Sequence, residues 1–208
     1  VAESWPKLFQ PDYTENITKI LQAQPQAMFC GLWGGDLVAF IDQGSIFGLF
    51  DKVEVFSIHM ADYTTLTSIK NLPQQGVYSS NRYVKVFPDT QANKSWAEEY
   101  HQRFKSYPTN WSWEAQAAIR AVIKAIQATK SADVPKLAEA MRGMEIDSPV
   151  GAKNGKMLMR KTDQTVVNYA LGWGRIVAKE PYLTNIDAAD WDQVTAQETE
   201  WKKARGYA

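Results

Sequence analysis

The chain of 208 residues is 45% hydrophobic and 12% aromatic, and its 23 basic residues balance its 23 acidic residues. A net charge of zero argues against nucleic acid as a partner, because a nucleic-acid-binding protein needs a basic face to displace counterions from phosphate. No run approaches the roughly 18 to 20 apolar residues of a membrane-spanning helix. The composition therefore predicts one or two packed cores and no direct membrane insertion by this chain.

Few side chains are suited to metal binding or covalent catalysis. The only cysteine, Cys30, lies in the apolar run AMFCGLW, and the two histidines, His59 and His101, are far apart and show no ligand spacing. A single cysteine excludes an intrachain disulfide and a cysteine-cluster metal site. We therefore expect no metal, no cofactor and no catalytic residue, and we interpret Cys30 as a small core residue.

The first residues, VAESWPKLF, lack the basic start and apolar run of a signal peptide. The protein is therefore either cytoplasmic or has lost its leader, and composition does not choose between the two.

Helical and strand patterns alternate from the N-terminus to about residue 87. Thr14 is expected to cap a helix that carries Ile17, Ile20 and Leu21 on one face and ends at Pro25. Buried strands are predicted over residues 27–33, over 53–58 and from about 76. Further helical patterns lie over 36–48, where Asp36 opens the helix, and around 63–69. This alternation implies an α/β fold with a parallel sheet covered on both faces.

Three helices then follow one another without a strand. The first carries an aromatic stripe of Trp96, Tyr100, Phe104 and Tyr107. The second, SWEAQAAIRAVIKAIQA, is apolar over more than half its circumference, so we expect it to be deeply packed. The third is capped by Asp133 or Ser131 and stops at Gly143. These helices need a sheet to pack on, and this segment supplies none.

Extended structure returns after residue 147. Asn154-Gly155 is a turn signal, and Val167, Tyr169, Leu171 and Trp173 alternate as in a strand. The polar tail from Pro181 is expected to hold a short helix over residues 191–203.

Five stretches of the chain resemble the C-terminal part of type I periplasmic solute-binding proteins, the branched-chain amino-acid receptor family of ABC transporters. In chain order they are PDYTENITKILQAQPQAMF, LWGGDLVAFIDQ, PQQGVY, SYPTNWSWEAQAAIRAVIKAI and MRKTDQTVVNYALGWGRIV. They span most of residues 10–178, and the tail from about residue 181 lies outside the resemblance.

The resemblance implies an α/β fold of the periplasmic-binding-protein-like I type, in which two lobes with parallel sheets flanked by helices hold the ligand in the cleft between them. Residues 1–84 look like most of the second lobe, residues 85–146 like the helical part of the first lobe, and residues 147–208 like a return to the second lobe plus a C-terminal tail. On this mapping the sheet under the three helices belongs to an N-terminal half outside this sequence.

Candidate ligand-binding residues follow the predicted strands, because ligands of parallel sheets sit beyond the carboxyl ends of strands. Trp33 offers a ring face, and Gly34 and Gly35 let backbone amides approach a ligand. A second group follows the next strand and consists of His59, Met60 and Tyr63. Packing roles stay open for all of them, and most of all for Met60 and Tyr63.

Gln75 is the most informative departure from the family pattern. In amino-acid-binding relatives the position before this glycine is similar to an acidic residue that pairs with the ligand's α-amino group. Here the sequence QQG puts an uncharged amide at that position. The resemblance therefore leaves a carboxylate, an aromatic acid or another small polar solute as plausible as an amino acid.

The sequence is thus interpreted as a non-enzymatic, periplasmic solute-binding component that delivers a small-molecule ligand to the membrane permease of an ABC transporter. Two alternatives stay open. One is a cytoplasmic ligand-sensing regulator or receptor ectodomain of the same fold. The other is a nucleotide-using α/β enzyme, which would need a G-x-G-x-x-G or P-loop motif that the sequence does not contain.

Overall fold

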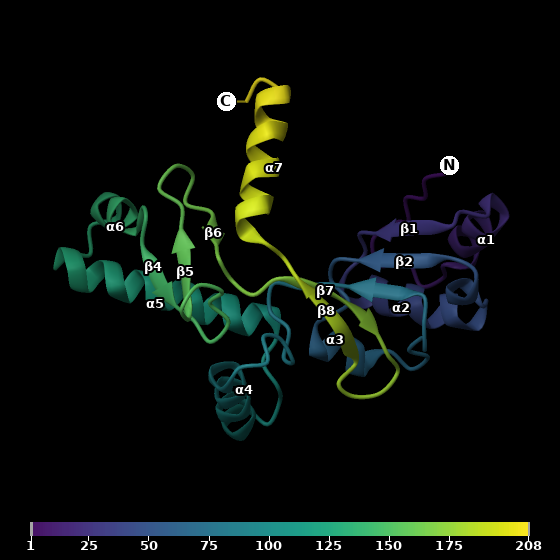
Figure 1. The fold of residues 1–208 in the computed structure, drawn as a ribbon. Coiled ribbons are helices and arrows are strands. Elements are labelled where there is room, and N and C mark those ends of the chain that lie inside the picture. The colour runs from purple at the N-terminus through teal and green to yellow at the C-terminus, as the bar shows by residue number, and fades with distance from the viewer. Residues whose placement is uncertain (1, 208) are drawn as a thin grey trace. The chain divides into compact units, whose positions relative to one another are not determined.

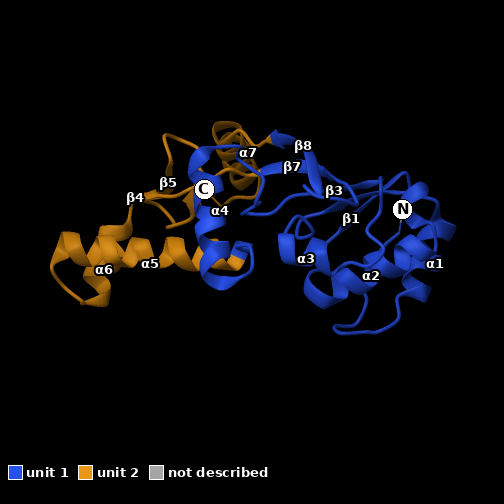
Figure 2. Ribbon diagram, turned by 90° about the horizontal axis from the view of Figure 1, so that it is seen from below, with its two compact units in different colours: residues 1–110, 172–187 blue, residues 111–171, 188–208 orange. Residues whose placement is uncertain are grey.

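The structure, a computed structural model, describes residues 2–207. Two compact units make up the chain, one of residues 1–110 and 172–187 and the other of residues 111–171 and 188–208 (Figure 2). Each unit contains its own sheet.

The first unit is built on a five-stranded sheet with the order β1-β2-β3-β7-β8 (Figure 1). Its strands are β1 (Ala27–Cys30), β2 (Glu54–Ser57), β3 (Val77–Ser79), β7 (Gly172–Ile176) and β8 (Leu183–Ala188). The first three run parallel, with Cys30 paired to Ser57 and Ser57 paired to Ser79. β7 joins β3 antiparallel. The predicted parallel α/β sheet is confirmed for β1, β2 and β3.

The connecting helices of this unit follow the predicted order. They are α1 (Thr14–Ala23), α2 (Gly34–Ile46), the short 3₁₀ helix η1 (Leu49–Asp51), α3 (Tyr63–Ser68) and α4 (Gln91–Phe104). α1, α2 and α3 lie on one side of the sheet (Figure 2). The core between these helices and the sheet contains Ile17, Leu37, Phe40, Ile41, Val55 and Val77, because the apolar positions of α1 and α2 recur at helical spacing.

The second face of this sheet differs from the prediction. Along β1 and β2 the side chains alternate, so that Cys30 and Val55 are buried while Phe29 is 66% and Phe56 is 37% exposed. The predicted cover on both faces is therefore wrong for β1 and β2 within residues 2–207. Phe56 instead stacks on Tyr78, with ring centroids 5.2 Å apart.

Local boundaries shift by a few residues. α1 begins at Thr14, and its N-cap is Tyr13, so the predicted Thr14 cap is wrong; the Asp12 carboxylate accepts the Thr14 amide at 2.8 Å. β1 ends at Cys30 instead of residue 33, and its pairing with β2 ends at the same point, with Cys30 opposite Ser57. Trp33 becomes the N-cap of α2, which starts at Gly34 and not at Asp36.

The second unit combines three helices with a small antiparallel sheet. The helices are α5 (Asn110–Thr129), α6 (Val134–Met141) and α7 (Trp191–Ala204), and the sheet order is β4 (Glu145–Asp147), β5 (Lys156–Met159), β6 (Val166–Val167). Asp133 caps α6 by accepting the Lys136 amide at 3.2 Å, as predicted. Asn154 and Gly155 both have positive φ, which confirms the predicted turn before β5.

The long helix α5 is less buried than predicted. One side is packed, where Trp113, Ala121 and Ala125 are buried and Lys124 Nζ donates to the Glu145 carbonyl of β4 at 2.7 Å. The opposite side is open, with Ile119 62% and Ile123 48% exposed. The prediction of deep packing is wrong because the small sheet β4-β5-β6 covers one side of α5 only.

Candidate functional site

The carboxyl ends of three neighbouring parallel strands form one edge of the five-stranded sheet. β1 ends at Cys30, β2 at Ser57 and β3 at Ser79, and these three residues are paired in register. The loops that follow them therefore leave the sheet side by side. Ligands of parallel sheets bind at such an edge, so it is the candidate site.

Trp33 and the two glycines after it lie at this edge, as predicted. Trp33 is 60% exposed and has an extended backbone with φ −149° and ψ 166°. Gly34 has a φ of +57°, which a glycine adopts at little cost, and no atom lies within 4 Å of the place of a Cβ at Gly34 or Gly35. The start of α2 is thus bare and the indole ring is accessible beside it.

Asp36 plays a different part from the one that its place at the helix start indicated. Its carboxylate accepts the Tyr13 hydroxyl at 2.9 Å and the Phe9 amide at 3.2 Å, and the residue is buried. Burial and this carboxylate raise the pKa of Tyr13. Asp36 therefore fixes α1 and the N-terminal segment to α2 instead of occupying the first amides of the helix.

His59 lies two residues beyond β2 at the same edge and is half-buried. Burial, and secondly the positive charge of Arg82, lower the pKa of His59. A lowered pKa favours the neutral form of the imidazole, which can donate one hydrogen bond and accept another. This suits recognition of a polar group.

Met60 and Tyr63 follow His59 but are held by the protein itself. Met60 is fully buried in the core cluster and presents no surface to a ligand. The ring of Tyr63 packs edge-on against Tyr107 at 5.1 Å, and its hydroxyl donates to Glu180 at 3.3 Å. Burial, followed by the Glu180 carboxylate, raises the pKa of Tyr63 to about 12. Both positions favour a packing role for these two side chains.

Gln75 is not brought together with the other six candidates. It lies before β3, at the amino end of the parallel strands, where its amide donates to Asp51 Oδ1 at 3.5 Å. Trp33 and His59 follow their strands and so lie at the opposite end. Gln75 therefore does not share a site with Trp33 and His59.

The loops after β2 and β3 are fixed by hydrogen bonds. The Ser79 hydroxyl accepts the Ala61 amide at 2.9 Å, and the Ser80 amide donates to the Ser57 carbonyl at 3.3 Å. Asp62 caps α3 through the Thr64 amide at 3.1 Å and accepts the Asn110 amide at 3.0 Å. These contacts hold the base of the site in one conformation, which lowers the entropic cost of binding a ligand there.

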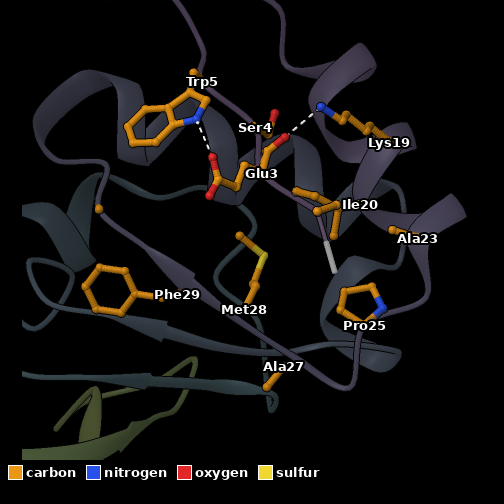
Figure 3. A pocket seen from close by; sticks show the side chains of 12 residues that line it. Glu3, Ser4, Trp5, Lys19, Ile20, Ala23, Pro25, Ala27, Met28 and Phe29 are labelled. Atoms are coloured by element: carbon orange, nitrogen blue, oxygen red, sulfur yellow. Dashed lines mark hydrogen bonds between the residues drawn. The ribbon is translucent and has the colours of Figure 1, made fainter.

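A separate pocket of about 640 Å³ opens beside the outer edge of β1 (Figure 3). It lies between residues 2–5, α1 and β1, and its lining includes Trp5, Ile20, Met28 and Phe29. Glu3 holds its rim, because the Glu3 carbonyl accepts Lys19 Nζ at 2.6 Å and the carboxylate accepts Trp5 Nε1 at 3.2 Å. None of the predicted site residues lines it.

No group of three or more potential metal ligands occurs within residues 2–207. In the same part of the chain no helix has the length and apolar character that crossing a membrane demands.

The model of one protein family, described as periplasmic binding protein, matches residues 1–172. The chain belongs to this family. The match confirms the predicted family and its α/β fold. No curated protein matches the chain.

Solved structures of periplasmic binding proteins share the fold. An amino acid ABC transporter substrate-binding protein from Pseudomonas fluorescens is 20% identical, with a TM-score of 0.71 over 90% of this chain and 51% of that one. A solute-binding protein from Rhodopseudomonas palustris in complex with 3,4-dihydroxybenzoic acid is 22% identical, with a TM-score of 0.73 over 86% and 49%. A leucine-binding protein from Thermotoga maritima is 13% identical, with a TM-score of 0.63 over 88% and 49%. The chain thus spans about half the length of the structures it matches.

Proposed function

We propose that the chain is the ligand-binding part of a periplasmic solute-binding protein, which carries a small organic solute to the membrane permease of an ABC transporter. The observation that carries this proposal is the accessible edge formed by Trp33, the bare start of α2 and His59, in a chain of the periplasmic binding protein family. The solute is an amino acid or an aromatic or carboxylic acid. The protein binds its ligand without chemical conversion.

This edge suits reversible binding. An exposed indole ring and bare backbone amides contact an apolar or planar group, and a neutral histidine recognises a polar group. We propose that the edge is one wall of an inter-lobe cleft, with residues 1–84 and 147–208 in one lobe and residues 85–146 in the other. The two lobes close around the ligand if the ligand binds the closed state more tightly than the open one.

The exposed side of α5 supports one part of this mapping, namely that a sheet of the first lobe packs on this helix. A helix with an apolar stripe open to solvent is typical of a surface that another element covers. The stripe consists of Trp111, Ala115, Ala118, Ile119, Val122, Ile123 and Ile126, all exposed. On the proposed mapping, the sheet of the first lobe covers this stripe.

Ligand binding is tested by the thermal midpoint of the protein with L-leucine, benzoate and a nucleotide, because a ligand that binds the folded state raises the midpoint by mass action. Stabilisation by leucine or benzoate is expected. Trp33→Ala is expected to abolish this shift while leaving the ligand-free midpoint near that of the wild type. Trp201→Ala, which removes an exposed tryptophan from α7, is the matched control and keeps the shift. Stabilisation by the nucleotide alone contradicts the proposal.

A further inference from the structure

The outer edge of β1 leaves backbone groups of the five-stranded sheet without a neighbouring strand. Within residues 2–207, β1 is the first strand in the sheet order and pairs with β2 on one side only. The Gln26 carbonyl accepts the Glu54 amide at 3.1 Å, and alternate residues of a parallel strand bond to the same neighbour. The amides and carbonyls of Ala27 and Phe29 therefore point away from β2. No hydrogen bond of these two residues crosses the outer edge in the part of the chain that the structure describes.

The pocket of about 640 Å³ lies along this same edge (Figure 3). β1 bounds it on one side, and residues 2–5 and α1 bound it on the other, with Ile20 and Met28 in its apolar lining. Two large apolar side chains beside it are exposed, Phe29 by 66% and Trp5 by 85%. An extended segment adds to a sheet at such a place, because the unpaired edge supplies main-chain hydrogen bonds and the pocket takes side chains.

A strand added at this edge has apolar neighbours on both of its faces. On the face that carries α1 and α2, it meets Ile20 and Met28. On the other face it meets Phe29, which lies in register with Phe56, and Phe56 stacks on Tyr78 with ring centroids 5.2 Å apart. Strands that are covered on both faces are continuous runs of aliphatic residues, without polar alternation. The edge therefore fits a wholly apolar strand and not an amphipathic one.

Two sources of such a strand are another copy of this chain and the rest of a longer protein. In a second copy, β1 is flanked by the same residues 2–5, which stand across the pocket from the edge and obstruct the approach of another sheet. The chain spans only 51% and 49% of two of the structures that share its fold. A strand from the remaining half would be covalently linked to this chain, and this link raises its effective concentration at the edge. These observations favour the longer protein as the source.

We propose that the outer edge of β1 binds an apolar β-strand from the N-terminal half of the protein. The strand inserts between β1 and residues 2–5, forms hydrogen bonds with the backbone of Ala27 and Phe29, and fills the pocket with its side chains. It thereby extends the five-stranded sheet by one strand. The proposal concerns how the two halves of the protein assemble, so it goes beyond solute binding and does not depend on which ligand is bound.

The test compares this chain with the longer protein isolated from its source, by residue-resolved amide hydrogen exchange. In the chain alone, the amides of Ala27 and Phe29 are expected to exchange at nearly intrinsic rates, while those of Met28 and Cys30, which point towards β2, are protected. In the longer protein, protection of Ala27 and Phe29 is expected to rise about 100-fold or more. Protection that appears in the chain alone at high concentration identifies a second copy as the occupant and overturns the proposal. An intact mass of the isolated protein equal to that of the 208 residues overturns it as well.

Phe29→Lys distinguishes an occupied edge from an open one. Because Phe29 is largely exposed in this chain, the variant is expected to shift the thermal midpoint of the chain by about 2 °C or less. In the longer protein the same lysine lies against the inserted strand, so a loss of about 5 °C or more is expected. Phe9→Lys is the matched control, since Phe9 is 86% exposed and is not among the residues that line the pocket. Equal shifts for Phe29→Lys in the two proteins contradict the inserted strand and leave the solute-binding function untouched.

Discussion

At the scale of single residues, the atoms around Gly76 exclude a larger residue more strictly than its backbone conformation does. Gly76 has a φ of +75°, and a Cβ at this position would collide with the carbonyl oxygen of Phe50. The loop between α2 and β2 therefore lies directly against the entry of β3. The Val55 amide donates to the Gly76 carbonyl at 2.7 Å, so the glycine also contributes to the sheet.

Gly76→Ala is expected to destabilise the protein by about 3 kcal/mol or more, because the left-handed conformation alone costs an alanine about 1 to 2 kcal/mol and the backbone clash adds to it. Gly155→Ala is the matched control. Gly155 has a φ of +72° but no atom within 4 Å of a Cβ, so only the conformational cost of about 1 to 2 kcal/mol applies. Denaturant unfolding measures the free energy of unfolding of both variants. An equal loss of stability in the two would show that the Phe50 backbone moves to accommodate the new methyl group.

At the scale of elements, the C-terminal helix α7 is attached to its unit mainly by polar contacts. No residue of α7 is buried. Arg160, at the end of β5, donates to Glu198 of α7 at 2.6 Å and to Asp163 at 2.7 Å, and Lys202 lies 2.6 Å from Glu198. At the other end of the helix, Trp191 Nε1 donates to the Tyr169 carbonyl at 2.6 Å. Ion pairs that are only partly buried contribute little stability and are screened by salt.

Acid is expected to loosen α7 before the rest of its unit. Arg160, and secondly Lys202, lower the pKa of Glu198 from its usual value of 4.5 to about 2. A depressed carboxyl pKa stabilises the folded state above about pH 4.5, and this contribution is lost as the pH falls towards 2. Amide hydrogen exchange in residues 191–204, corrected for intrinsic rates, should therefore rise between pH 5 and pH 3 more than in residues 110–129.

Glu198→Gln is expected to raise exchange in α7 already at pH 7 and to flatten its dependence on pH. Asp163, whose pKa is also lowered, chiefly by the Thr165 amide, leaves a residual dependence. Glu200→Gln is the control, since Glu200 is exposed on the same helix. If exchange in α7 of the wild type follows that of α5 at every pH, the ion pairs do not hold the helix.

The sequence predicts an element well when nearby residues determine its structure, and poorly when a distant part of the chain does. The apolar spacing of Leu37, Phe40 and Ile41 is a property of the helix itself, and α2 packs as that spacing predicts. The same reasoning fails for α5, because burial of Ile119 and Ile123 depends on a partner sheet that lies on one side only. The strand-end rule correctly places Trp33 and His59 beyond the carboxyl ends of β1 and β2. The positions of Met60, Tyr63 and Gln75 depend instead on tertiary packing and on strand direction, which the local sequence does not determine.

At the scale of the whole molecule, the exposed apolar side of α5 has no covering element within the described residues. The chain spans about half the length of the structures it matches. An apolar stripe along a 20-residue helix is large enough to drive association when nothing covers it. The stripe stands apart from the packed side of the same helix, where Ala121 and Ala125 are buried. Substitutions on the two sides should therefore act on different properties.

Ile123→Glu is expected to change the free energy of unfolding by about 0.5 kcal/mol or less, as for a surface position, and to weaken self-association of the chain at high concentration. Ala121→Glu buries a charge at a position only 2% exposed, so it is expected to destabilise by several kcal/mol. Sedimentation velocity over a concentration series measures association, and denaturant unfolding measures stability. If Ile123→Glu lowers stability as Ala121→Glu does, the stripe is packed within the chain itself. The proposed lobe boundary, which leaves this side of α5 to a sheet from elsewhere in the protein, would then lose its support.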